Sequence, residues 1–112
     1  KDSLDAIPAE KLLQMAKEDL ITVLDVRPKE EFEAGHVQGA INIPVEELEQ
    51  HLAEFNPEHE IVAYCRGPHC ILAFDAVAQL REKGFQARRL EDGFPEWRIA
   101  GLPVEDNSSN TH

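Results

Sequence analysis

Residues 61–74 read IVAYCRGPHCILAF and hold both cysteines of the chain, Cys65 and Cys70. The apolar run before Cys65 predicts a buried strand, and the residues from Cys70 onward have the spacing of a helix. A cysteine placed in this way stands at the carboxyl end of a strand, where the ligands of parallel sheets bind. Three uses of the pair are open at this point: a disulfide, half of a metal site, or a nucleophile with a partner.

Strand and helix patterns alternate along the rest of the chain. Short apolar runs predict strands within residues 20–26, 39–44, 60–65 and 85–91. Apolar spacing and end signals predict helices within residues 7–19, 29–36, 45–55, 70–84 and 93–101. In the fourth helix we expect a buried stripe of Ala73, Val77 and Leu80, widened by Phe74 and Ala78. The alternation predicts an α/β fold, a single domain with a mostly parallel central sheet flanked by helices.

The composition fits a globular domain and excludes several classes of function. A chain of 112 residues is long enough for one hydrophobic core, and residues 106–112 are expected to form a polar tail. The net charge of -11 repels phosphate backbones, so we expect no direct nucleic-acid binding by this domain. No apolar run approaches the roughly 20 residues of a membrane span, and no secretory leader opens the chain. With only two cysteines, a reducing, cytoplasmic setting is expected.

The loop between the two cysteines is suited to a charged sulfur. A free thiol titrates near pH ~8.5, and the unpaired N–H groups and partial positive charge of a helix N-terminus favour the thiolate. Arg66 adds a nearby positive charge, and His69 adds one when it is protonated. Gly67 and Pro68 favour a sharp turn, whose remaining amides can form a nest for an anion. Cys65 is therefore the candidate nucleophile, in a loop that can bind an anion or a persulfide.

Motifs on either side of this loop resemble those of one known family. The segment LDVRPKEEFEAGHVQGAINIP, residues 24–44, resembles the signature of rhodanese domains. YCRGPHC, residues 64–70, stands where that family carries its catalytic cysteine loop, and LEDGFPEWRIAGLPVE, residues 90–105, matches its closing segment. The resemblance covers residues from about 7 to 105, in order and at normal spacing. It implies a rhodanese-like domain over residues 7–105.

The resemblance implies sulfur transfer through a persulfide on Cys65. A small donor such as thiosulfate or a polysulfide gives its outer sulfur to the thiolate, and the persulfide passes it to a thiol or cyanide acceptor, without a metal or an organic cofactor. The loop departs from the usual Cys-Arg-x-Gly-x-Arg pattern, because Pro68 replaces Gly and Cys70 replaces the second Arg. Loss of that arginine removes a bidentate donor for an oxyanion, which argues against ordinary thiosulfate activity.

The variant loop is similar to that of a subgroup found in bacterial regulators. In those proteins an ArsR-type winged-helix DNA-binding domain precedes the rhodanese domain. The chain opens with KDSLDAIPAE and no Met, as if it were cut from a longer protein. We therefore expect the full-length protein to carry a DNA-binding domain before this one.

The role of Cys70 stays open between two interpretations. It either resolves an oxidised or persulfidated Cys65 by forming a reversible disulfide, or packs under the loop as a small apolar residue. The disulfide requires the two Cα atoms to lie within about 7 Å. A metal site is not expected, because four residues separate the cysteines and the nearest histidine, His69, lies in the same loop.

Asp25, Arg27 and His36 are candidates for a supporting role around the loop. Asp25 and Arg27 end a strand at the same edge of the sheet and can orient the loop or the substrate. An Arg27–Glu31 pair, which would only brace the turn, is the alternative. For His36 we expect a hydrogen bond that fixes its turn, rather than a part in catalysis.

Three functional classes follow from these residues. The first is a sulfurtransferase acting through Cys65. The second is a redox or persulfide sensor, in which the Cys65/Cys70 pair reports to an attached transcriptional regulator. The third is a reductase of arsenate or another oxyanion that uses both cysteines, a reading weakened by the missing second arginine. The first two classes share their first chemical step.

Overall fold

The computed structural model describes residues 6–67 and 70–106, so the expectations for Pro68, His69 and residues 107–112 lie outside it. Its main sheet has five strands in the order β1-β6-β5-β2-β4, and each neighbouring pair is parallel. The strands are β1 (Ala6–Ile7), β2 (Ile21–Asp25), β4 (Ile41–Asn42), β5 (Glu60–Tyr64) and β6 (Ala87–Leu90). The predicted α/β fold with a mostly parallel sheet is confirmed.

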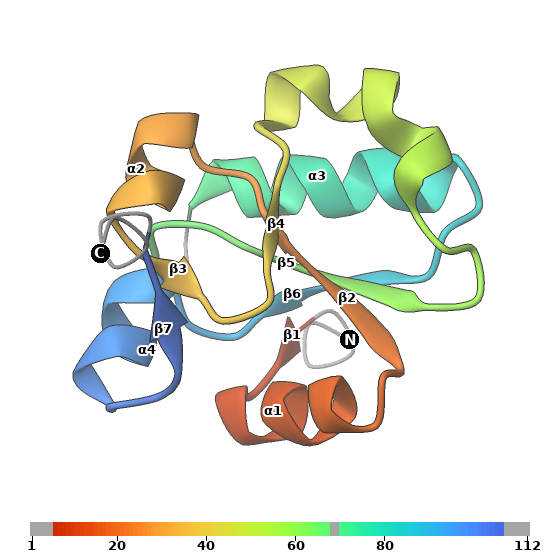
Figure 1. Cartoon of the computed structure of the whole chain (residues 1–112). Helices are drawn as coiled ribbons and strands as arrows, with labels where there is room; N and C mark the ends of the chain where they lie inside the picture. The colour runs from red at the N-terminus through yellow and green to blue at the C-terminus, as the bar shows by residue number, and fades with distance from the viewer. Residues whose placement is uncertain (1–5, 68–69, 107–112) are drawn as a thin grey trace.

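Helices cover both faces of this sheet (Figure 1). One face is covered by α1 (Ala9–Lys17), and the other by α3 (Ile71–Glu82) and the 3-10 helix η2 (Val45–Glu54), drawn in yellow to yellow-green. Helices α2 (Lys29–Ala34) and α4 (Phe94–Ile99) follow β2 and β6, and therefore lie at the carboxyl edge of the sheet. Beside them β3 (His36–Val37) pairs antiparallel with β7 (Val104–Glu105). Among the described residues no helix is long and apolar enough to span a bilayer.

Alternation of side chains along β5 divides the hydrophobic core into two clusters. Ile61, Ala63 and Cys65 belong to the cluster that packs under α3 and η2. Val62 and Tyr64 belong to the cluster on the opposite face, toward α1 and α4. All five residues are buried. This period of two places the side chain of Cys65 on the face covered by α3, the helix that begins next to it.

The helix predicted within residues 45–55 is present but is of the 3-10 type. Its apolar residues lie on the covered face, with Val45, Leu48 and Phe55 buried and Leu52 partly buried. The strands β1, β3 and β7, of two residues each, were not predicted. Each pairs with a segment far away in the sequence, which no local pattern indicates.

The buried stripe predicted for α3 was wrong at two positions. Ala73, Val77 and Leu80 are buried as expected, but Phe74 and Ala78 are exposed. At 100° per residue these two positions lie to one side of the stripe, which Ala76 completes instead. The ring of Phe74 lies 4.4 Å from the guanidinium carbon of Arg89, so an exposed cation–π contact covers part of it.

Candidate active site

Cys65 directly follows β5, the middle strand of the sheet, and is 1% exposed. A disulfide joins it to Cys70, with the two Cα atoms 6.1 Å apart, within the limit that the sequence analysis set. Cys70 is partly buried and is the N-cap residue of α3. The disulfide therefore holds the sulfur of Cys65 at the N-terminus of α3.

The N-terminus of α3 offers this sulfur a favourable electrostatic environment. The helix has 12 residues, its N-cap makes no side-chain hydrogen bond, and its first turn carries no acidic residue. The first-turn N–H groups and the helix dipole therefore favour negative charge beside Cys70 and the sulfur bonded to it.

The turn between β6 and α4 supports the cysteine loop. The backbone N–H of Phe94 donates to the carbonyl oxygen of Cys65, at 2.9 Å. A Cβ on Gly93 would overlap the Cα and N of Gly67 and the carbonyl carbon of Arg66. Only glycine fits at position 93 in this arrangement. This contact was not predictable from the sequence, because Gly93 stands out there only by its place in the closing motif.

Arg66 lies on the loop, but its guanidinium pairs with Glu31 of α2. Nε lies 2.9 Å from Oε1 of Glu31, and Nη2 lies 2.8 Å from Oε2. The hydrogen bonds and charge of Glu31 raise the pKa of Arg66, and those of Arg66 lower the pKa of Glu31. The Arg27–Glu31 brace, one of the two alternatives for Arg27, is therefore not formed, because Glu31 pairs with Arg66 on the loop. The carboxylate also offsets the positive charge that Arg66 was expected to bring to Cys65.

Asp25 and Arg27 form a buried ion pair at the end of β2. Nη2 of Arg27 lies 2.7 Å from Oδ2 of Asp25, and Nε lies 3.0 Å from Oδ1. Arg27 Nη2 also donates to the carbonyl oxygen of Gly35 at 2.6 Å, and its guanidinium carbon lies 4.6 Å from the centroid of the Phe94 ring. Burial opposes the charge of Arg27, but the hydrogen bonds and charge of Asp25 outweigh burial and raise its pKa.

Tyr64, the residue before Cys65, connects this ion pair to the central strand. Its hydroxyl donates to Oδ2 of Asp25 at 2.7 Å and accepts from the backbone N–H of Val37 at 3.0 Å. Burial, then the charge and hydrogen bond of Asp25, raise the pKa of Tyr64 far above its ordinary value. The role of Tyr64 was not predictable from the sequence, because a tyrosine in a buried strand looks like any core aromatic. Through Tyr64 and Phe94 the ion pair contacts two residues that adjoin Cys65: the residue before it in the chain and the residue that donates a hydrogen bond to its carbonyl oxygen.

His36 has the structural role predicted for it. Its Nδ1–H donates to the carbonyl oxygen of Phe32 at 2.7 Å, and its ring stacks on that of Phe32 with centroids 3.6 Å apart. Nε2 lies 3.6 Å from a carboxylate oxygen of Glu105 on β7. The predicted hydrogen bond that fixes this turn is confirmed.

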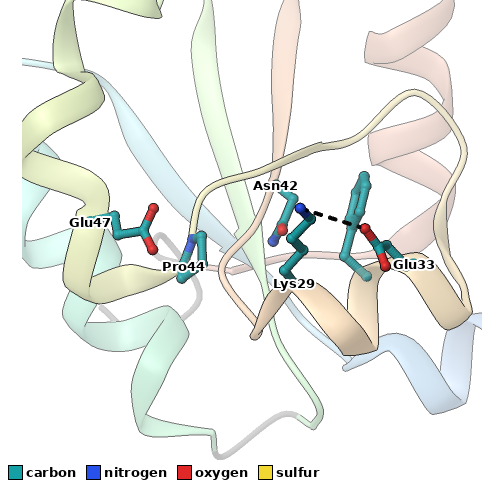
Figure 2. Close-up of a pocket in the computed structure, with 6 residues that line it drawn as sticks. Lys29, Glu33, Asn42, Pro44 and Glu47 are labelled. Atoms are coloured by element: carbon teal, nitrogen blue, oxygen red, sulfur yellow. Dashed lines mark ion pairs between the residues drawn. The ribbon is translucent and has the colours of Figure 1, made fainter.

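A pocket of about 350 Å³ opens between α2, the end of β4 and the start of η2 (Figure 2). Lys29 and Glu33 form an exposed ion pair of 3.9 Å in its wall. The pocket is lined by Lys29, Phe32, Glu33, Asn42, Pro44 and Glu47. Among the described residues, the lining of this pocket includes neither Cys65 nor Cys70.

Known proteins share both the sequence motifs and this fold. A family model described as Rhodanese-like domain matches residues 8–100. The chain is 49% identical over 108 residues to the HTH-type transcriptional regulator Rv0324 of Mycobacterium tuberculosis, a match that covers 96% of this chain and 48% of the regulator. It is 28% identical over 99 residues to the thiosulfate sulfurtransferase GlpE of Shewanella oneidensis, covering 88% of this chain and 96% of that protein. The chain thus spans about half the length of the regulator that it resembles.

A solved structure agrees with these matches. The crystal structure of the BH2092 protein from Bacillus halodurans superposes with a TM-score of 0.86 at 30% identity, covering 94% of this chain and 80% of that one. The family match over residues 8–100 and the shared architecture lead to one conclusion: the chain belongs to the rhodanese-like family.

Proposed function

We propose that this domain, over residues 7–105, transfers sulfane sulfur through a persulfide on Cys65. The observation that carries the proposal is the position of Cys65, buried at the end of the central strand and beside the uncapped N-terminus of α3. A thiolate or persulfide there gains the helix N–H groups as partners. Similarity to a thiosulfate sulfurtransferase over 88% of this chain supports the same reading.

Sulfur transfer takes two displacement steps, and in each a thiolate attacks a sulfur atom. The Cys65 thiolate attacks the outer sulfur of the donor, the sulfur–sulfur bond of the donor breaks, and its remainder leaves with the electron pair. For thiosulfate the leaving group is sulfite. An acceptor thiolate then attacks the outer sulfur of the persulfide, and Cys65 leaves as the thiolate.

The charges around the loop bear on the choice of donor. Arg66 is paired with Glu31, and Cys70 stands where the family usually has a second arginine. The charge of Arg66 is thus offset, and the charge of the second arginine is absent. Both would otherwise attract a donor that is a dianion, such as thiosulfate. We therefore expect thiosulfate to load Cys65 slowly.

Mass spectrometry of the intact chain tests this function. The reduced chain is incubated with polysulfide or thiosulfate, and we expect a gain of one sulfur atom that cyanide or a thiol removes. Cys65→Ser should abolish the gain, whereas Cys70→Ser should retain it. If Cys70→Ser, which cannot form the internal disulfide, gains no sulfur from either donor, the sulfurtransferase function is wrong.

A second candidate function is a redox or persulfide sensor, and the Cys65–Cys70 disulfide favours it. The Cys70 thiolate attacks the inner sulfur of a Cys65 persulfide, which forms the disulfide and releases hydrosulfide. Similarity to a transcriptional regulator supports a full-length protein in which a DNA-binding domain precedes this one. In a cytoplasmic, reducing setting such a disulfide forms transiently, as a signal requires.

The sensor function is tested by the fate of the persulfide. In the wild-type chain we expect polysulfide to give a Cys65–Cys70 disulfide together with free sulfide. In Cys70→Ser the persulfide should persist on Cys65 and release no sulfide. A wild-type chain that accumulates the persulfide without disulfide would exclude the sensor step and leave the sulfurtransferase function intact.

A further inference from the structure

The two cysteines of the Cys65–Cys70 disulfide differ in their exposure. Cys65 is 1% exposed and packs in the core cluster under α3. Cys70 is only partly buried, at the start of that helix. An incoming thiolate must approach the sulfur it attacks along the S–S axis, from the side opposite the leaving sulfur. Of the two residues, Cys70 is therefore the more accessible to a thiolate from solvent.

We propose that external thiols reduce this disulfide by attack on Cys70, with Cys65 as the leaving group. The inference rests on the disulfide of the proposed sensor function and does not depend on sulfur transfer. It names Cys70 as the sulfur that bonds to the reductant, and a dithiol as the class of reductant that completes the reaction.

The reaction balances in two steps. A thiolate of the dithiol attacks Sγ of Cys70, the Cys65–Cys70 bond breaks, and its electron pair stays on Sγ of Cys65. The second thiolate of the reductant then attacks its own sulfur in the mixed disulfide, and Cys70 leaves and takes a proton from water. The dithiol becomes a disulfide and gives two electrons, while both cysteines of the chain are reduced.

Two features of α3 support this direction. Departure of Cys65 creates negative charge at the helix N-terminus, where the uncapped first turn stabilises it. Ile71, the residue next to Cys70, is apolar and 75% exposed. Although the chain carries a net charge of -11, the first turn of α3 holds no acidic residue to repel an anionic thiolate. The attack also frees the thiolate of Cys65 in its first step.

The direct test maps the first adduct. The 112-residue chain is oxidised with diamide, treated with a limiting amount of 2-mercaptoethanol, quenched in acid and alkylated. Trypsin cleaves after Arg66 and so separates the two cysteines into different peptides. We expect the mercaptoethanol adduct on the Cys70 peptide and the alkyl group on the Cys65 peptide. An adduct on Cys65, or equal amounts on both, would overturn the inference and leave both proposed functions standing.

A pair of surface variants tests the approach route. Ile71→Asp places a negative charge beside Cys70 and should slow reduction by an anionic thiol roughly fivefold at low ionic strength, with the difference lost in high salt. Ile99→Asp makes the same change at an isoleucine that is 86% exposed on α4, and should leave the rate unchanged. Equal rates for the two variants, or no Cys65–Cys70 disulfide after oxidation, would overturn the inference. Sulfur loading of the reduced chain is measured in a separate experiment. Failure of this inference can therefore be told apart from failure of the sulfurtransferase function.

Discussion

Gly93 packs directly against the backbone of Gly67, leaving no room for a side chain between the turn after β6 and the cysteine loop. We expect Gly93→Ala to push the loop away, because the overlapping atoms belong to the backbone and cannot rotate aside. Overpacking of this kind costs about 1–3 kcal/mol of unfolding free energy. Urea denaturation measures that loss, and the rate of Cys65–Cys70 disulfide formation should fall with it.

The matched control for this variant is Gly67→Ala, judged by stability alone. Apart from Gly67 itself and its two chain neighbours, no described residue has an atom within 4 Å of a Cβ built on Gly67. Its unfolding free energy should therefore stay within about 0.5 kcal/mol of the wild-type value. Equal losses in the two variants would contradict the tight contact at position 93.

The buried Asp25–Arg27 pair gives a second prediction. Asp25→Asn leaves the Arg27 guanidinium buried without its counter-ion, which should cost about 3–5 kcal/mol of unfolding free energy. Arg27 is only 5% exposed, so water cannot replace the lost carboxylate. Urea denaturation measures the change. Glu33→Gln, which breaks an exposed ion pair with Lys29, should cost less than about 0.5 kcal/mol, and a loss as large as that of Asp25→Asn would refute the distinction.

Tyr64 gives a prediction for high pH. Because its pKa is raised in the folded state, the neutral hydroxyl stabilises the fold fully below the unfolded pKa of about 10, and this stability is lost as the pH rises above it. Tyr64 is the single tyrosine of the chain, so tyrosinate absorbance reports on it alone. We expect no titration near pH ~10 while circular dichroism remains native, with tyrosinate appearing only as the chain unfolds.

The same titration in concentrated urea is the control. There the midpoint should return to about 10, the ordinary value for tyrosine. A midpoint near that value in the folded chain would mean that Tyr64 is not held by Asp25 in the way described.

Glu31 gives a prediction for donor preference, which rests on the proposed sulfurtransferase function. Glu31→Gln removes the carboxylate that offsets Arg66, so kcat/KM for thiosulfate should rise roughly two- to fivefold at low ionic strength and converge with the wild-type value in high salt. Glu30→Gln removes the same charge from an exposed position on the same helix. If both variants change the rate equally, the effect reflects net charge and not the Arg66 pair.

Local patterns were enough to predict most of the fold. The apolar periods of the strands and helices depend on neighbouring residues, so they are readable along the chain, and they placed Cys65 at the carboxyl end of a strand. Phe74 and Ala78 of α3 were wrongly predicted to be buried. They lie at the edge of the buried stripe, where a small error in the predicted direction of the buried helix face changes whether a residue is buried. The turn hydrogen bond of His36 was also predictable, because its partner, Phe32, is only four residues away.

The contacts that shape the site were not predictable in this way. Arg66 meets Glu31 across 35 residues, and Tyr64 meets Asp25 across 39. Such pairs form only because parallel strands bring their carboxyl ends to one edge of the sheet, and no local period encodes which side chains then meet. The sequence by itself determined the α/β layers and the position of Cys65 at the carboxyl end of a strand. The tertiary structure decided that Glu31 pairs with Arg66, that Tyr64 bonds to Asp25, and that Cys70 is the more exposed of the two cysteines.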